Sequence, residues 1–576
     1  MLKNLSLIIG LVALILAYFY NPFQSVSYSP IVETEFGKVV GKISLSRTGK
    51  EFYAYLGIPY ALPPVEERRF ESPEPPKAWT GVKQATTYGS QCIQLEMLSN
   101  KLTGSEDCLF LNVFSPKVTG QAGLPVMVFI HGGAFISGSS NIYGATYFMD
   151  EQVILVTLNY RLAGLGFLNT GDGVVRGNMG LKDQLMALTW INANIKSFGG
   201  DPNRVTLFGE SAGAASVHYH VLSPRSKGLF SKAIAQSGTP LNSWALYPNP
   251  EKQSKRFAAK FGCPIDNSKE MVACLKRLDA VELVNAHYEM LLPLRDSITL
   301  FVPTIETLVD DKAFLSESPR ILLKEGRFNK MPMMAGVNSE EGLLTSAVIT
   351  ANQTKMDQAN EQWTWWLSKI LNIPEDEQKA KLIRKFYFGN TKNIASKAFL
   401  SNYTNLFSDR FFMVANHQHA KLYSSHAPIR LYYYTHQGDF SLGRIMASSQ
   451  GRFPLIVNVV IDMFSRWFQR TVMNENVPHM GTAHADELPL LFDFILGYDI
   501  KRTHKDFELS ANMVKLWVSF ATNDESEIVT YSNIKWMPVS ATDTKFTYLQ
   551  IASKPQLIED PFRERVNFWE SLAIPS

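Results

Sequence analysis

The pentapeptide GESAG at 209–213 places Ser211 between two glycines, after a β-rich run and before a plausible helix start. A serine at a sharp strand-to-helix turn is strained, and side chains two positions before and after it would collide with the neighbouring strand and helix. Glycine at both positions avoids that collision, so the pattern predicts a serine lifted clear of a sheet as a nucleophile. On the pentapeptide alone, a tight turn with an inert serine is the alternative.

A second pattern, HGGAF at 131–135, directly follows a buried apolar run that ends at Ile130. Adjacent glycines let the backbone approach a ligand and turn consecutive N–H groups toward it. We predict that the N–H groups of Gly133, Ala134 and Ala212 form an oxyanion hole, each donor contributing about 3–4 kcal/mol. A simple β-turn is the alternative for the loop taken alone. His131 lies before the loop, and we expect it to be structural rather than a base.

Eleven histidines compete to be the general base. The chain order serine, acid, histidine favours one late in the chain, and His484 lies there in the loop-like stretch GTAHADELP. His218 and His220 are close to the serine in sequence, but a helix would carry them away from the turn. His417 and His419 form an H-x-H pair without further ligands beside it, so we expect no metal site there.

The acid that orients the histidine should follow a strand. Glu340 and Glu341 stand in GVNSEEG, directly after the apolar run 333–336. From the residues alone both glutamates are candidates, and a solvated surface pair is the alternative for two adjacent carboxylates.

The elements that must position these groups follow the pattern of an α/β protein. Short apolar runs separated by helical stretches predict a large, mostly parallel sheet with helices on both faces. We predict strands at 126–130, 153–158, 205–208, 233–235, 333–336 and 430–434, and a helix over 183–195. The segment 342–422 is rich in Trp and Phe, and we interpret it as a helical insertion that covers the active edge of the sheet. Ordinary core aromatics are the alternative for any single one of these side chains.

Length and charge limit the function classes. The chain has 576 residues, is 45% hydrophobic and shows no internal repeat or long linker, so we expect one catalytic domain over residues 25–576. A net charge of +3 on 56 cations and 53 anions is too balanced for a polyanionic partner, and we expect no nucleic-acid binding.

Residues 1–24 combine Lys3, an apolar run and a breaker, which predicts a signal peptide or an uncleaved signal anchor. The sequons at Asn352 and Asn402 agree with secretion. We therefore expect a secreted glycoprotein, with a membrane-anchored or luminal protein as the alternative. An even number of cysteines also suits an oxidising compartment, and local pairing is the simplest of the three possible connectivities. The expected disulfides join Cys92 to Cys108 and Cys263 to Cys274.

Three stretches resemble the type-B carboxylesterase family, which includes cholinesterases and juvenile hormone esterases. They are HGGAF at 131–135, GGDPNRVTLFGESAGAASV at 199–217 and EDCLFLNV at 106–113, and the resemblance runs from about residue 30 to the C-terminus, closest to insect-type carboxylesterases. It implies a single α/β-hydrolase domain with helical insertions over a deep gorge. It also implies a triad of Ser211, His484 and Glu341, acting on carboxylic esters through an acyl-serine without metal or organic cofactor.

The resemblance also bears on the substrate. Cholinesterases carry a tryptophan between their first two cysteines, and 92–108 contains none, so a choline ester specialist is disfavoured. Juvenile hormone esterases usually have Gln where this chain has Glu210, which disfavours that specialisation less strongly. The stretch 297–301 falls near the acyl pocket of the family and lacks paired phenylalanines, so we expect medium or bulky acyl groups to fit. An inactive adhesion-type relative and a slow protein that sequesters esters or organophosphates are the alternatives from other classes.

Overall fold

The protein is described from a computed structural model, which covers residues 26–574 apart from 97–98, 118–122, 292–299, most of 450–479, 494–498 and 524–528. The predicted signal segment 1–24 lies outside the described residues. So does most of the predicted acyl-pocket stretch 297–301, of which residues 300 and 301 are described.

The strands confirm the predicted α/β pattern, because each of the six predicted apolar runs forms one. In chain order the strands are β1 (Tyr28–Thr34), β2 (Gly37–Leu45), β3 (Glu51–Pro59), β4 (Val82–Gln84), β5 (Gln94–Leu95), β6 (Leu102–Thr103), β7 (Phe110–Pro116), β8 (Leu124–Ile130), β9 (Ile154–Leu158), β10 (Gly200–Glu210), β11 (Lys232–Gln236), β12 (Met333–Asn338), β13 (Ile429–Tyr434), β14 (Val529–Tyr531), β15 (Ile534–Trp536), β16 (Thr547–Ile551) and β17 (Gln556–Glu559).

Over the described residues, one large sheet has the strand order β1-β2-β3-β7-β9-β8-β10-β11-β12-β13-β16-β17, with β4 beside β2. The run from β9 to β16 is parallel, and the strands at both ends are antiparallel. Every residue of β8 is buried, as expected for a central strand with both faces covered. The carboxyl ends of β10, β11 and β12 therefore lie side by side, and β10 leads directly to Ser211.

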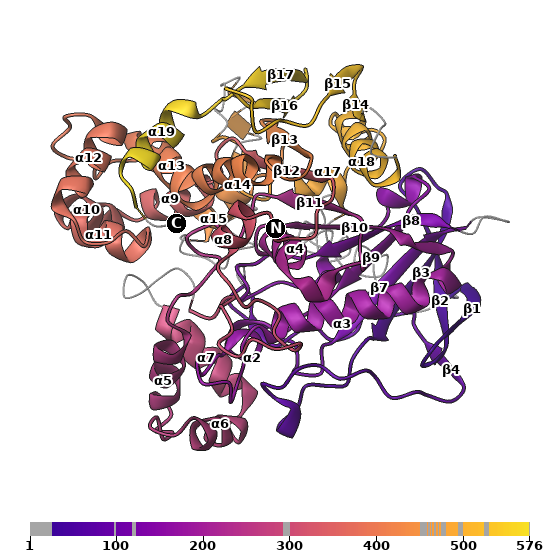
Figure 1. Cartoon of the computed structure of the whole chain (residues 1–576). Helices are drawn as coiled ribbons and strands as arrows, with labels where there is room; N and C mark the ends of the chain where they lie inside the picture. The colour runs from indigo at the N-terminus through magenta and orange to yellow at the C-terminus, as the bar shows by residue number, and fades with distance from the viewer. Residues whose placement is uncertain are drawn as a thin grey trace, which may run out of the picture.

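Helices alternate with the strands along the chain and fill both faces of the sheet. They are α2 (Ala163–Phe167), α3 (Met179–Asn194), α4 (Ala212–Leu222), α5 (Pro250–Ala259), α6 (Ser268–Lys276), α7 (Ala280–Leu291), α8 (Pro319–Lys324), α9 (Leu343–Thr350), α10 (Gln353–Glu361), α11 (Trp363–Ile370), α12 (Glu377–Phe388), α13 (Leu400–Ser408), α14 (Val414–Ser424), α15 (Leu442–Ser448), α17 (Leu488–Leu491), α18 (Phe507–Thr522) and α19 (Arg563–Ser571). In Figure 1 the strands cross the centre of the molecule, and α10, α11 and α12 gather at one side.

Alternate side chains of β8 belong to different hydrophobic clusters, which shows that the sheet separates two cores. Val126 and Val128 pack in a cluster with α3 and α4. Met127 and Phe129 pack in a second cluster with α18. This alternation is what the two-residue period of a strand dictates when both of its faces are covered.

The segment 342–422 is helical, as predicted, and runs through α9 to α14. Trp363 and Trp366 stack with ring centroids 5.5 Å apart and help to hold this insertion together. The insertion also touches the segment that contains the predicted acid, because the Gly342 N–H donates to the Ser408 hydroxyl at 2.8 Å.

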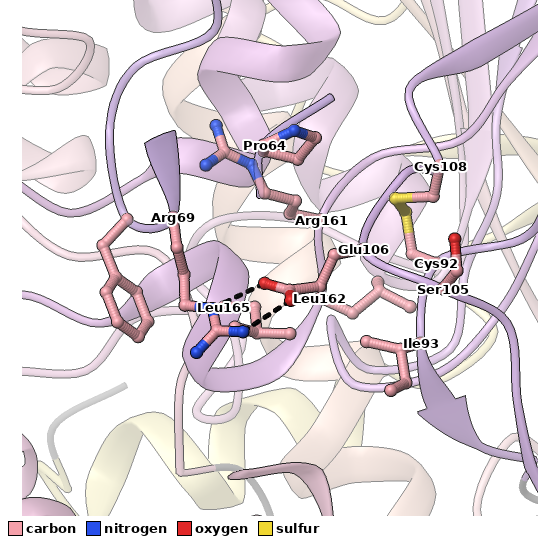
Figure 2. A pocket seen from close by; sticks show the side chains of 11 residues that line it. Pro64, Arg69, Cys92, Ile93, Ser105, Glu106, Cys108, Arg161, Leu162 and Leu165 are labelled. Carbon is pink, nitrogen blue, oxygen red and sulfur yellow. Dashed lines mark hydrogen bonds and ion pairs between the residues drawn. A yellow bond between two sulfur atoms is a disulfide. The ribbon is translucent and has the colours of Figure 1, made fainter. Parts of the chain in front are cut away.

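Two disulfides close short loops, and they are the two sequence-local pairs, Cys92–Cys108 and Cys263–Cys274. Figure 2 shows a cleft beside the first disulfide, where Arg69 donates to both carboxylate oxygens of Glu106 at 2.6–2.7 Å. The predicted catalytic residues do not line this cleft. We interpret the Arg69 pair as structural, because Arg69 also donates to three backbone carbonyls of 275–278. Over the described residues, every helix is too short or too polar to cross a lipid bilayer.

Candidate active site

Ser211 lies at the turn between β10 and α4, in a conformation that few residues adopt. Its φ is 58° and its ψ is −121°, and its N–H donates to the Gln236 carbonyl at 2.8 Å. A Cβ on Gly209 would lie 2.6 Å from the backbone of Gly213, and a Cβ on Gly213 would lie 2.0 Å from the Ile130 oxygen. Both glycines are therefore required for the strained turn to form.

His484 and Glu341 meet although 143 residues separate them. Nδ1 of His484 lies 2.6 Å from Oε2 of Glu341, which is fully buried. The other oxygen of Glu341 accepts hydrogen bonds from the Ser237 hydroxyl at 2.5 Å and from the Asn338 N–H at 2.8 Å. These bonds fix the carboxylate, which in turn fixes the tautomer and the orientation of the imidazole.

Glu340 is directed elsewhere. Its carboxylate accepts a hydrogen bond from the Thr482 N–H at 2.7 Å and another from the Ser339 hydroxyl. It therefore supports the loop that contains His484 without touching the imidazole.

The second nitrogen of His484 faces Glu210, the residue before the serine. Nε2 lies 3.0 Å from Oε1 of Glu210, close enough for an ion pair but without hydrogen-bond alignment. Because Glu210 adjoins Ser211, this contact brings the imidazole to the nucleophile elbow, the turn between β10 and α4 that carries Ser211. Among the described residues, the Ser211 hydroxyl makes no hydrogen bond. Catalytic hydrogen bonds of this kind often tighten only when substrate binds.

The protonation of His484 is set by two opposing influences. Burial disfavours the charged imidazole, but the charges of Glu210 and Glu341 outweigh burial and raise the pKa of His484 well above 6.5. The base is therefore held between two carboxylates, each of which stabilises the imidazolium.

A third buried carboxyl group, Glu487, lies close to this pair and was not predicted. It accepts hydrogen bonds from Gln236 at 3.0 Å and Asn338 at 2.7 Å. Burial, followed by the charge of Glu210, raises the pKa of Glu487 to about 7. The only signal in the sequence was its position three residues after His484, within the same short motif.

The glycine loop after β8 lies against the serine. A Cβ on Gly132 would lie 3.0 Å from Cβ of Ser211. Ala134 has a positive φ of 55°, and among the described residues no acceptor takes the N–H of Gly133 or Ala134. Ala212 begins α4, so its N–H has no partner within the helix. Three backbone donors are thus available at the turn.

The other histidines considered from the sequence, His131, His417 and His419, are packed among aromatic rings. His131 stacks on Tyr160 with ring centroids 4.4 Å apart, and burial lowers its pKa to about 4. His417 packs on Phe546, whereas His419 packs on His218 at 4.0 Å, so the H-x-H pair does not converge on one point. Over the described residues, no group of three or more His, Cys, Asp or Glu side chains could hold a metal ion.

An aromatic side chain of the insertion covers the base. Phe412 belongs to a π-helical turn, Asp409–Met413, and its ring lies 4.5 Å from the His484 ring. The carbonyl oxygen of Phe411 accepts hydrogen bonds from Asn242 and from Trp244, the latter at 2.9 Å. These two side-chain donors anchor the π turn that carries the Phe412 ring.

Comparisons with known proteins show the family of this chain. The family model described as "Carboxylesterase family" matches residues 28–569. A carboxylic ester hydrolase of Bombus ignitus is 35% identical over 98% of both chains. Venom carboxylesterase-6 of Apis mellifera is 33% identical over 94% of both chains. Juvenile hormone esterase of Tribolium castaneum is 36% identical over 88% of this chain and 85% of its own.

Proposed function

The chain belongs to the carboxylesterase family and is a carboxylic ester hydrolase, and we propose that it works through an acyl intermediate on Ser211. The observation that carries this proposal is the placement of His484 between Glu341, 2.6 Å from Nδ1, and the nucleophile elbow. In this proposal His484 is the general base and Glu341 the acid that orients it.

The first half-reaction forms the acyl-enzyme. The Ser211 oxygen attacks the ester carbonyl carbon while Nε2 of His484 takes the hydroxyl proton. The carbonyl π bond breaks, and the resulting oxyanion is held by the N–H groups of Gly133, Ala134 and Ala212. The C–O bond to the alcohol then breaks, and His484 returns its proton to the departing alkoxide oxygen.

The second half-reaction repeats these steps with water as the nucleophile. His484 removes a proton from water as the water oxygen attacks the acyl carbon, and the Ser211 oxygen leaves with a proton from His484. The carboxylic acid is released and the enzyme returns to its starting state. The nucleophile of the first step, the base and the oxyanion donors of this scheme all belong to the chain.

We propose that residues 25–576 act as one catalytic domain and that the protein is secreted. The name of the Apis mellifera relative assigns that protein to venom, which supports an extracellular role. Of the two sequons, Asn352 caps α10 with its side-chain oxygen, whereas the Asn402 amide donates to the Tyr387 carbonyl at 2.7 Å. Peptide mass spectrometry of protein secreted from insect cells should find a glycan on Asn352 and none on Asn402. Protein retained in the cell would contradict secretion.

A specialised juvenile hormone esterase is the second candidate function, because one relative carries that name at 36% identity. Glu210 stands where such esterases usually have Gln, which favours the general esterase. Slow sequestration of esters would show as one equivalent of alcohol released per chain, followed by little turnover.

The test is a hydrolysis screen of p-nitrophenyl esters of increasing acyl length, with an acylthiocholine for contrast and Ser211→Ala as the inactive control. We expect turnover of medium acyl chains, little hydrolysis of the acylthiocholine and none by the variant. Undiminished turnover by Ser211→Ala would refute the mechanism.

A further inference from the structure

The direction of one proposed oxyanion donor is fixed by hydrogen bonds on the neighbouring carbonyl. The peptide bond between Gly133 and Ala134 is trans, so its C=O and its N–H point in opposite directions. The Gly133 oxygen accepts hydrogen bonds from the N–H groups of Ile136 and Ser137, both at 3.0 Å. These bonds direct the carbonyl toward the inside of the glycine loop, residues 131–138, and so direct the Ala134 N–H away from it. The orientation of this donor therefore depends on where the end of the loop is held.

One buried glutamine, Gln94, holds the end of the glycine loop. Its Oε1 accepts hydrogen bonds from the Ser137 hydroxyl at 2.8 Å and from the Gly138 N–H at 2.6 Å. Its Nε2 donates to the Gly138 carbonyl at 2.8 Å and to the Cys92 carbonyl at 2.9 Å. Gln94 is 2% exposed and lies in β5, inside the loop that the Cys92–Cys108 disulfide closes. Both lone-pair positions and both protons of the amide are thus used, and burial shields these bonds from water.

A second side chain holds the same part of the glycine loop from α7. The Tyr288 hydroxyl donates to the Leu95 carbonyl at 2.8 Å and lies 3.0 Å from the Ile136 carbonyl. Leu95 follows Gln94 in β5, so this hydroxyl joins the disulfide-closed loop to the glycine loop beside the glutamine. Both links come from elements outside the glycine loop and act on residues 136–138.

We propose that Gln94 is a positioning residue for ester hydrolysis, which acts on the oxyanion through the glycine loop. Its amide holds Ser137, the Ser137 N–H holds the Gly133 carbonyl, and the trans peptide then aims the Ala134 N–H at the oxyanion. This N–H donates most strongly once negative charge develops on the substrate oxygen. The inference rests on the proposed function, because it concerns the orientation of a donor in the same site.

The size of the effect follows from the cost of losing an oxyanion donor. Removal of one such donor lowers kcat by about 10²–10³-fold. A loop without the Gln94 amide keeps the Ala134 N–H but no longer fixes its direction, so we expect a smaller loss, of about 10–30-fold. Because this interaction forms mainly in the transition state, kcat and kcat/KM should fall together and KM should change little.

The test replaces Gln94 by Met, which has a similar volume but lacks the donors and the acceptor of the amide. With p-nitrophenyl butyrate, Gln94→Met should show a kcat about 10–30-fold below wild type and a KM within about twofold of it. A trifluoromethyl ketone, which Ser211 converts to a tetrahedral oxyanion, should bind more weakly by the same factor as kcat. The matching methyl ketone, which stays largely unreacted, should bind equally well to both proteins. A glutamine that only stabilised the fold would not produce this difference between the two ketones.

Gln91→Met is the matched control, because Gln91 belongs to the neighbourhood of the same disulfide. Its Nε2 donates to Glu96 at 3.2 Å and to Thr103 at 2.6 Å, so its side-chain bonds in the described part of the chain stay away from the glycine loop. This variant should leave kcat and both ketone affinities unchanged. Tyr288→Phe removes only the hydroxyl and should change kcat and the ketone affinities in the same direction as Gln94→Met.

The outcomes separate the inference from the proposed function. An unchanged kcat in both Gln94→Met and Tyr288→Phe, or equal losses of affinity for the two ketones, would overturn the inference and leave the esterase function intact. Losses in Gln91→Met as large as those in Gln94→Met would also overturn it. If Gln94→Met fails to fold, Tyr288→Phe decides the result by the same measurements. A wild-type protein that does not hydrolyse the ester would refute the proposed function itself.

Discussion

Replacing Glu210 by Gln removes one of the two carboxylate charges that contact the proposed general base. Glutamine has nearly the same shape, so the substitution tests charge with little change in packing. In the native protein, Oε1 of Glu210 is 3.0 Å from Nε2 of His484 and raises the pKa of the imidazole. Catalysis requires neutral His484, so activity rises with pH through this pKa. Removing the carboxylate lowers the pKa and must move the acidic limb of the rate profile to lower pH.

The distance between Glu210 and His484 sets the size of the expected pKa shift. Unit charges about 4 Å apart at an effective dielectric constant of 20 interact by about 4 kcal/mol, equivalent to about three pK units. Glutamine keeps a dipole at the same place, and Glu341 still stabilises the imidazolium. We therefore expect a shift of about one to two pH units.

The assay is the pH dependence of kcat/KM for a neutral p-nitrophenyl ester, which reports the pKa of the free enzyme. Glu377→Gln, whose side chain is 75% exposed on α12, serves as the control, and its profile should coincide with that of the wild type. An acidic limb that stays in place, or moves to higher pH, would refute the conclusion that Glu210 raises the pKa of His484.

Three further perturbations probe the acid, the elbow and the buried histidines. Glu341→Gln should lower kcat by about 10³–10⁴-fold and Glu340→Gln by less than about tenfold; equal effects in steady-state assays would remove the acid assignment. Gly213→Ala should lower the free energy of unfolding by at least about 1–3 kcal/mol, because its Cβ would lie 2.0 Å from the Ile130 oxygen. Gly438→Ala, where the new Cβ would have no atom closer than 3.6 Å, should leave urea unfolding unchanged. Similar losses in the two variants would contradict the steric explanation. Burial lowers the pKa of His218 to about 3 in the folded protein, whereas an unfolded histidine has a pKa of about 6.5. As the pH falls below about 6.5, the unfolded state therefore binds the proton first, and the folded protein loses stability. His218→Phe should reduce the pH dependence of the unfolding free energy between about pH 6.5 and 4.5 by about 1.4 kcal/mol per pH unit, and an unchanged slope would argue against a buried neutral imidazole.

The parallel core of the fold could be predicted because local composition determined it. The run 126–130 is apolar at every position, and the structure buries it on both faces as β8. The antiparallel strands β1 to β3 were not predicted, since their alternation is weaker and several of their side chains are exposed. The order of the strands in the sheet could not be predicted from the sequence either, because it depends on contacts between segments far apart in the chain.

The elbow and the glycine loop were recognisable because their function demands particular residues at adjacent positions. The choice of Glu341 over Glu340 came only from the family resemblance, since adjacent carboxylates are indistinguishable by local pattern. The contact of Glu210 with His484 joins positions 274 residues apart, and no short motif encodes it. The π turn that places Phe412 on the imidazole was unpredictable for the same reason, because it is stabilised by side chains from a distant loop.

Covalent labelling of the nucleophile tests the central claim most directly. An organophosphate reacts much faster with a serine that has both a general base and an oxyanion hole than with an ordinary serine. Peptide mass spectrometry after labelling should place one adduct on Ser211, and the adduct should be absent from Ser211→Ala and form much more slowly in His484→Ala. An adduct on another residue, or none in the folded wild-type protein, would contradict the assignment of Ser211 as the nucleophile.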